Sequence, residues 1–213
     1  MGTPAEGAKT LVSREDLLVQ RCKRGEAGAF DELVRLYEKK VYNLAFRLSG
    51  NRDDAYDLAQ EAFLRVYNAV RDFRGQSSFS TWLYRVVTNV CLDQLRSRAR
   101  HPVTSLDEPL STEKGELPRQ ITDDGLDPEE EIERLELKAA VQKGIDSLKG
   151  EYRTIIVLRD IQDLPYEDIA DILNLSLGTV KSRLNRARLA LRGILSDMEL
   201  FREDDVRRAG ISR

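Results

Sequence analysis

The stretch Tyr166–Leu195 is the sequence feature that most constrains the fold of this chain. Its first part, Tyr166–Leu173, has the apolar spacing of a short amphipathic helix. Asn174 follows, where a tight turn needs a residue that tolerates positive φ, and Ser176 is a residue type that caps helices. These features predict two helices joined by a tight turn.

The second of these helices has two contrasting faces. Its apolar stripe is narrow and consists of Val180, Leu184, Ala187 and Leu191. The segment Ser176–Arg192 contains five Lys or Arg residues and no Asp or Glu. The pattern is typical of a helix-turn-helix that enters the major groove of DNA, with Lys181, Ser182, Asn185 and Arg186 on or near its outer face. The alternative is a helical hairpin with a solvated basic face, but turn chemistry and charge asymmetry both favour DNA binding.

Net charge alone would not indicate a nucleic-acid partner. The 213 residues carry a formal charge of -3, and their number allows one large or two small domains. The acidic residues are concentrated in one segment, Val103–Glu136, which holds twelve Asp or Glu against three Lys or Arg. The flanking helices are locally basic, so the net charge of the whole chain hides a basic surface that can bind a polyanion.

Cysteine, histidine and hydropathy exclude several classes of protein. Cys22, Cys91 and His101 are the only residues of their types, which is too few for a usual zinc site. The two cysteines need not pair and are expected to be small buried hydrophobes. No apolar run reaches membrane-spanning length, and the polar start is unlike a signal peptide. We expect a soluble, cytoplasmic protein with no cofactor, no metal and no membrane insertion.

The first half of the chain predicts four helices. A capping box at Ser13 starts the first, which runs to Arg24, and a long amphipathic pattern from Phe30 ends at Gly50. The third helix is expected over Asp53–Val70, and the fourth starts near Phe79.

The outer face of the third predicted helix collects Asp57, Gln60, Glu61 and Leu64. A leucine among carboxylates suits docking to a basic partner better than it suits water. A solvated acidic face with one exposed leucine is the other interpretation, and spacing alone leaves both open.

The fourth predicted helix has a basic flank formed by Arg85, Asn89 and Arg96. An amide beside arginines can bind an unstacked base and its phosphates. Trp82 lies beside this flank, but its phase favours a place in the core.

The pattern breaks at His101–Pro102, and no sustained period returns before Asp127, where a cap, a proline and acidic residues start another helix. That helix runs to about Leu148, and the next is predicted over Tyr152–Ile161. Because no strand-like alternation of useful length occurs, the sequence predicts an all-α fold. Two small helical domains, residues 11–101 and 128–197, would be joined by a flexible acidic linker over 102–127.

Three runs together resemble a known family: Asp53–Phe63, Phe79–Arg85 and Gly178–Arg188 are similar to the motifs of extracytoplasmic-function (ECF) sigma factors of bacterial RNA polymerase. The match extends from Leu17 to Leu195 in the family's order. The resemblance implies a sigma domain 2 and a sigma domain 4 with a helix-turn-helix, without the intermediate domain of larger sigma factors. It implies a transcription initiation factor that directs promoter-specific transcription, and not an enzyme.

The resemblance also implies a role for each candidate surface. Asp57, Gln60, Glu61 and Leu64 match the part that docks on the beta-prime clamp helices of core RNA polymerase, whose beta subunit is a further expected partner. Asn89 matches the part that captures a flipped base of the minus-ten element, with Arg85 and Arg96 on phosphates. Lys181, Ser182, Asn185 and Arg186 match the face that reads the minus-thirty-five element of promoter DNA. An anti-sigma factor is implied as a regulator, and the linker is expected to thread basic channels of the polymerase.

Two other interpretations compete. One is a helix-turn-helix transcriptional regulator that binds DNA, usually as a dimer, without polymerase. The other is a metal-dependent hydrolase built on Asp53, Asp54, Asp57 and Glu61. Asp54 is turned away from the other three, no histidine supports them, and each is more simply a dipole partner or a docking residue.

Overall fold

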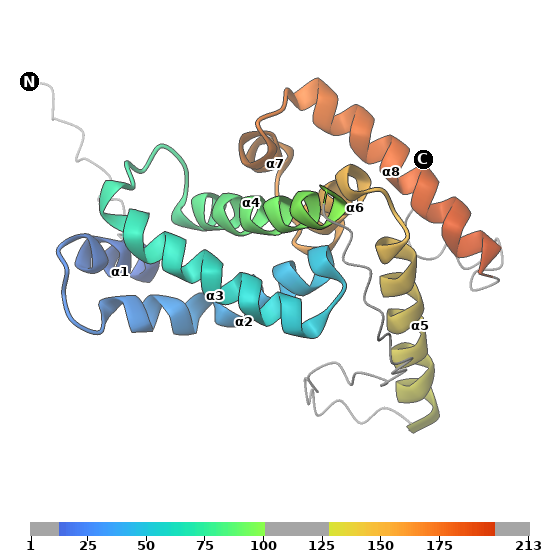
Figure 1. The fold of residues 1–213 in the computed structure, drawn as a ribbon, viewed down its shortest axis with the longest axis horizontal. Helices are drawn as coiled ribbons and strands as arrows, with labels where there is room; N and C mark the ends of the chain where they lie inside the picture. The colour runs from blue at the N-terminus through green and yellow to red at the C-terminus, as the bar shows by residue number, and fades with distance from the viewer. Residues whose placement is uncertain (1–12, 101–127, 199–213) are drawn as a thin grey trace, which may run out of the picture.

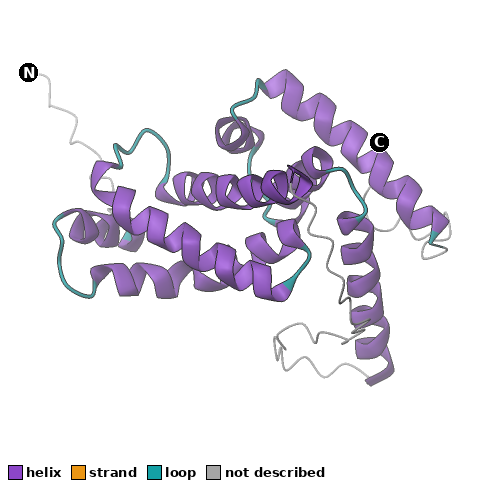
Figure 2. Cartoon of the chain, viewed as in Figure 1, coloured by secondary structure: helices purple, strands orange, loops and turns teal. Residues whose placement is uncertain are grey.

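The computed structural model describes residues 13–100 and 128–198, and every regular element in these ranges is a helix (Figure 1, Figure 2). The elements are α1 (Arg14–Lys23), α2 (Ala29–Ser49), α3 (Arg52–Ala69), the 3-10 helix η1 (Val70–Asp72), α4 (Phe79–Arg100), α5 (Pro128–Asp146), α6 (Gly150–Ile156), the π-helix η2 (Val157–Ile161), α7 (Tyr166–Leu173) and α8 (Leu177–Asp197). The predicted all-α class is confirmed. The predicted linker and the expected cap at Asp127 lie outside the described residues.

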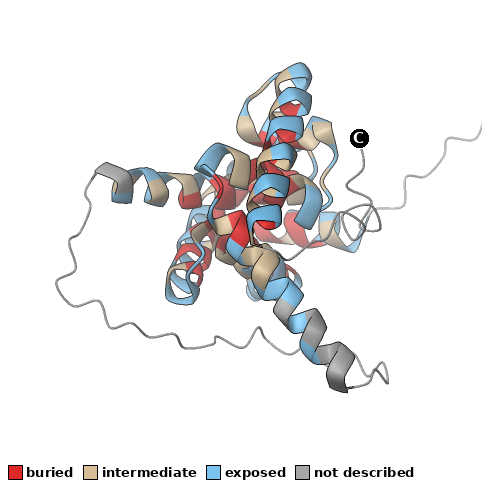
Figure 3. Cartoon of the chain, turned by 90° about the vertical axis from the view of Figure 1, so that its right-hand side faces the viewer, coloured by how far each residue is buried: buried red, intermediate tan, exposed pale blue. Residues whose placement is uncertain are grey.

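Helices α1–α4 form the N-terminal bundle, in which α2 packs against α1, α3 and α4. Its core consists of fully buried side chains that recur along the facing stripes, among them Leu33, Val41, Leu44, Leu48, Val66, Leu83 and Val87. Figure 3 shows that the buried positions gather where the helices face one another. Burying side chains of this size contributes about 1.5–3 kcal/mol each to the stability of the bundle.

The predicted ends of these helices are largely observed. The Ser13 side chain accepts a hydrogen bond from the Asp16 amide at 3.0 Å, and the Asp16 carboxylate accepts one from the Ser13 amide at 3.2 Å, which completes the capping box. Gly50 ends α2 with φ +74°. The third helix stops at Ala69, one residue short of the prediction, and continues as η1. Trp82 is only partly buried, with its ring 5.2 Å from Phe73 and 5.6 Å from Phe79.

Helices α5–α8 form the C-terminal helices, in which α8 packs on α5, α6 and α7. One element differs from the prediction, which placed a single regular helix over Tyr152–Ile161. The helix begins at Gly150, and its last turn widens into η2, where the Gln162 amide reaches the Val157 carbonyl at 2.9 Å. Periodicity cannot distinguish such a turn, because the apolar residues keep nearly the same face.

The two groups of helices contact each other mainly where α7 lies against α4 (Figure 1). Further contacts join α2 to α5 and η2, and α4 to α6. In the described ranges, no helix is both long enough and apolar enough to cross a membrane.

Candidate functional site

The structure places the predicted site residues on three separate surfaces. The α3 face consists of Asp57, Gln60, Glu61 and Leu64; the α4 flank of Arg85, Asn89 and Arg96; and the α8 face of Lys181, Ser182, Asn185 and Arg186. Each surface lies on a single helix whose opposite side is buried, so its side chains are fixed in direction by the packing behind them.

All four residues of the α3 face are exposed, and the side of α3 behind them buries Ala55, Ala62 and Val66. Leu64 keeps 59% of its surface in contact with solvent, although it is a large apolar residue. Glu61 is bound by Arg65 at 2.8 Å, one turn further on, so the face is less acidic than its sequence indicates. The face thus combines an exposed apolar side chain with polar groups on the turns before it, a composition typical of a contact site.

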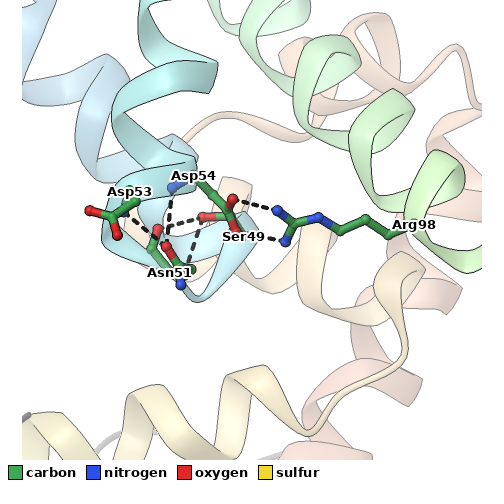
Figure 4. Close-up of polar contacts among 5 residues, drawn as sticks. All are labelled: Ser49, Asn51, Asp53, Asp54 and Arg98. Carbon is green, nitrogen blue, oxygen red and sulfur yellow. Dashed lines mark hydrogen bonds and ion pairs between the residues drawn. The ribbon is translucent and has the colours of Figure 1, made fainter. Parts of the chain in front are cut away.

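The N-terminus of α3 holds a contact that the sequence did not reveal (Figure 4). The Asn51 side chain caps the helix by accepting from the amides of Asp53 and Asp54 at 2.9 and 3.1 Å. The Asp54 carboxylate in turn accepts two hydrogen bonds from the Arg98 guanidinium, one of them 2.6 Å long. This bidentate pair joins the start of α3 to the last turns of α4.

The α4 flank is supported by its own N-terminus and by the core. Ser78 caps α4 by accepting from the Thr81 amide at 3.1 Å, and Val87 and Cys91 are fully buried behind the flank. Asn89 is exposed, and Arg85 is half-buried with its Nε atom lacking a hydrogen-bond partner among the described residues. Arg96 is bound to Asp93 at 3.2 Å.

A cavity of about 410 Å³ brings the three residues of the α4 flank together. Its remaining walls are Leu92 and the segment 170–175, which contains the end of α7 and the turn before α8. The predicted minus-ten residues therefore face the helix-turn-helix, which sequence analysis did not anticipate.

The α8 face depends on a turn and a cap that match the prediction. Asn174 ends α7 with φ 52°, in the left-handed region, and the Ser176 hydroxyl accepts from the Thr179 amide at 3.2 Å. Of the predicted stripe, Val180, Leu184 and Ala187 are buried and Leu191 is partly buried, while all four residues of the α8 face are exposed.

Four of the five basic residues of α8 fall into two pairs with different surroundings. Arg188 binds Asp160 through two hydrogen bonds of 2.6 and 3.1 Å, and Arg183 pairs with Glu151 at 3.2 Å. These two arginines hold α8 to the helices beneath it. Within the part of the chain that the structure describes, Lys181 and Arg186 have no acidic partner, so their charges are available to a ligand.

The carboxylates of the hydrolase interpretation do not converge. Asp54 is bound by Arg98 and Glu61 by Arg65. Over residues 13–100 and 128–198, no three His, Cys, Asp or Glu side chains are grouped as metal ligands would be.

Two family descriptions match this chain: "Sigma-70 region 2" over residues 33–101 and "Sigma-70, region 4" over residues 138–191. The ECF RNA polymerase sigma factor SigW of Bacillus subtilis is 41% identical over 181 residues, covering 84% of this chain and 96% of that protein. The ECF RNA polymerase sigma-E factor of Escherichia coli K12 is 37% identical over 177 residues, covering 83% of this chain and 92% of that protein.

Among solved structures, the sigma factor RpoE of Bartonella quintana, in complex with the anti-sigma factor NepR, is similar. Its TM-score is 0.60 at 26% identity, covering 80% of this chain and 98% of that one. The two matched regions lie in the N-terminal bundle and the C-terminal helices respectively. The chain belongs to the ECF family of RNA polymerase sigma factors, which are transcription initiation factors.

Proposed function

We propose that this chain binds core RNA polymerase through the α3 face and reads two promoter elements through the α4 flank and the α8 face. The observation that carries the proposal is the α8 face. Four exposed polar side chains stand on a capped helix that is held from behind by a buried stripe and two ion pairs. Such a helix presents fixed donors and acceptors to base edges in the major groove.

The α3 face has the composition of a docking site for the beta-prime clamp helices. Burying Leu64 against a partner would remove apolar surface from water, and the polar groups around it would set the orientation. Because this face and the α8 face lie on different groups of helices, polymerase and the upstream element can be bound at the same time.

The α4 flank supplies the groups needed to hold a single-stranded base. The Asn89 amide both donates and accepts, as recognition of a base edge requires, and Arg85 and Arg96 provide positive charge for the phosphates beside it. Capture of an extruded base offsets the few kcal/mol lost when that base leaves the stack. This face therefore drives promoter opening, whereas the α8 face gives position.

The α4 flank and the α8 face each bind DNA weakly, but their combined affinity is high when polymerase fixes the distance between them. Once one contact has formed, the second is effectively intramolecular. This dependence on polymerase distinguishes the proposal from a free helix-turn-helix regulator, which binds DNA tightly by itself. We infer a cytoplasmic location, where polymerase and promoters are, and an anti-sigma partner like that of the Bartonella relative.

The test is transcription from fragmented genomic DNA by core polymerase, with and without this protein. New start sites that share two spaced upstream motifs support the proposal. Specific binding to DNA by the free protein, without new start sites, would support the regulator instead.

Three variants assign the surfaces, each with a matched control. Lys181→Ala with Arg186→Ala removes two contacts of about 1–3 kcal/mol each, so initiation at promoters that need the upstream motif falls at least about thirty-fold. Polymerase binding stays normal, and exposed Arg192→Ala on the same helix has little effect.

Asn89→Ala leaves closed complexes intact but reduces opening, measured by permanganate reactivity of unpaired thymines. The control is Asn43→Ala, an exposed asparagine on α2. Normal opening with Asn89→Ala would show that the α4 flank is wrongly assigned.

Leu64→Ala should weaken polymerase binding. Leu36→Ala is the control and should not weaken it, because Leu36 is also exposed but lies on α2, away from the α3 face.

A further inference from the structure

The rotation of α8 about its own axis decides which of its side chains face the bases. Helix α8 lies over α5 and α6, with α7 beside its first turns (Figure 1). The apolar stripe behind the α8 face is narrow, and one of its four members, Leu191, is only partly buried. Because apolar packing has no preferred direction, the angle of the helix must be fixed by other contacts.

Two ion pairs hold α8 at opposite margins of this stripe. Arg183 pairs with Glu151 of α6 at 3.2 Å, and Arg188 binds Asp160 of η2. At about 100° per residue, Arg183 and Arg188 lie about 140° apart around the helix, with the stripe between them. Together the two pairs oppose rotation of α8 in either direction.

The two ion pairs differ in strength. The Glu151 side chain keeps 71% of its surface exposed, and a pair of this kind contributes little. The Asp160 side chain is 32% exposed, and it accepts hydrogen bonds from Arg188 Nε at 3.1 Å and from Arg188 Nη2 at 2.6 Å. Bidentate binding fixes the direction of a guanidinium as well as its distance. The pair with Asp160 therefore holds the angle of α8 more firmly.

Asp160 lies in the π-turn η2, which widens the end of its helix. The Gln162 amide closes this turn on the Val157 carbonyl at 2.9 Å. A turn of this kind changes the direction in which its side chains point, and it is common at functional positions. Here the side chain so directed reaches Arg188 of α8.

The chain after η2 has an uncommon conformation that one arginine supports. Asp163 has φ 52°, in the left-handed region, which costs free energy for a residue other than glycine. Arg159 donates to the Leu164 carbonyl at 2.9 Å and pairs with Asp163 at 3.2 Å. Its Cζ atom lies 5.2 Å from the centre of the Tyr166 ring, at the start of α7. These contacts hold η2, and with it Asp160, in one place.

Arg188 would be available to DNA if Asp160 did not bind it. Around α8 it lies about 20° from Lys181, and along the helix it lies three residues beyond Asn185, next to the α8 face. Its side chain is 40% exposed, so a released guanidinium can turn to a phosphate. An additional arginine on phosphates raises the affinity for all sequences alike and does not help to distinguish bases.

We propose that Asp160 is a positioning residue that gives the α8 face its base specificity. It acts through Arg188 in two ways: it fixes the rotation of α8, and it keeps this arginine from the phosphates. The proposal rests on the function proposed above for the α8 face. Accurate reading of the upstream element then depends on a carboxylate that lies outside that face.

The test compares holoenzymes assembled from core polymerase and the full chain or its variants. Each is titrated on a promoter with the mapped upstream motif and on the same promoter with one base pair of that motif changed. The ratio of the two affinities is the discrimination, which we expect to be about fivefold to 150-fold for the unmodified protein. The salt dependence of binding counts phosphate contacts, at a slope of about 0.9 for each.

Asp160→Ala should lower the discrimination about threefold, within the range for loss of one partly exposed ion pair. It should also steepen the salt dependence by about one phosphate contact, because Arg188 is released. Asp160→Glu keeps the carboxylate and should retain most of the discrimination. Glu167→Ala is the matched control, since it removes the same charge from an exposed site on α7 that pairs with no basic side chain among the described residues.

Arg188→Met separates the two parts of the proposal. It removes the ion pair together with the arginine, so the discrimination should fall as in Asp160→Ala while the salt dependence stays that of the unmodified protein. Asp160→Ala combined with Arg188→Met should behave like Arg188→Met alone, because the pair is already lost. Melting temperatures establish that every variant is folded during the titration.

Unchanged discrimination in both Asp160→Ala and Arg188→Met overturns the positioning role. An equal loss in Glu167→Ala also overturns it, because any lost negative charge would then suffice. Lower discrimination with an unchanged salt dependence in Asp160→Ala overturns the part in which Arg188 is kept from the phosphates. If Lys181→Ala with Arg186→Ala leaves the discrimination unchanged, the function proposed for the α8 face itself fails.

Discussion

At the scale of single residues, arginines make most of the ion pairs that join one element to another in the described ranges. Arg98 joins α4 to α3, Arg188 joins α8 to η2, and Arg153 binds the ends of α2 and α5. The planar guanidinium suits this use, because it donates several hydrogen bonds in a fixed geometry and keeps its charge when partly buried.

Asp54→Asn tests the contact between α3 and α4. The pair is partly exposed, at 49% for the Arg98 side chain and 19% for Asp54, so its contribution is at most about 1 kcal/mol. We expect the melting temperature to fall by about 1–3 °C. Asp53→Asn is the control, since Asp53 is exposed on the same turn and pairs with no basic side chain among the described residues. A double-mutant cycle with Arg98→Met that shows no coupling would contradict this account.

The two cysteines give a second prediction at this scale. Burial raises the pKa of the Cys91 thiol to about 12 and also raises that of Cys22. At pH 8, about one Cys91 thiol in ten thousand is then ionised, and the thiolate is the reactive form. A thiol reagent at pH 8 should modify neither residue in the folded protein within minutes and both in denaturant. Rapid stoichiometric reaction of the folded protein would show that the interior opens more readily than the structure indicates.

At the scale of elements, the helix ends decide how the surfaces are presented. Ser78, Asn51 and Ser176 cap the helices that carry the α4 flank, the α3 face and the α8 face respectively. Each cap satisfies amides that would otherwise lack a partner, and so it fixes the first turn of the helix.

Gly50→Ala and Gly193→Ala should have opposite effects on stability. Gly50 has φ +74° and faces Asp146, so a methyl group there is strained and should lower stability by about 1 kcal/mol or more. Gly193 lies within α8 with nothing within 4 Å of an added Cβ, so alanine should stabilise by about 0.5–1 kcal/mol. Urea denaturation of both variants measures the difference. If both variants change the free energy of unfolding equally, the close contact between Gly50 and Asp146 does not constrain the end of α2.

Most of the elements follow from local sequence, whereas the contacts between them do not. Helix α7 and the Asn174 turn were predicted correctly, because periodicity, a cap and a turn residue agree within a few positions. The η2 turn was missed because a widened turn hardly alters an apolar stripe. The Asp54–Arg98 pair and the cavity beside Asn89 join residues far apart in sequence, and charge or spacing in one segment carries no signal of such partners.

At the scale of the whole molecule, the two groups of helices are coupled through contacts that a single side chain can weaken. Coupled units unfold together, whereas uncoupled ones melt at their own temperatures. We expect one calorimetric transition in the unmodified protein and two in Arg153→Met. Two transitions in both proteins would mean that the groups are independent from the start.

Helix α8 also behaves as a lever. At 1.5 Å per residue its 21 residues span about 31 Å. The DNA-reading residues lie toward one end, and Leu195, near the other end, rests on Gly144 of α5, where an added Cβ would lie 2.7 Å from Leu195 Cδ2. A tilt of about 5° about that contact would move Lys181 by about 2 Å and Arg186 by about 1 Å, enough to lengthen a hydrogen bond to a base beyond its usual range. Small movements of α5 therefore become larger displacements of the DNA-reading residues. Because Gly144 has no side chain, α8 can pack closely on α5 at this point, and this close approach sets the angle between the two helices.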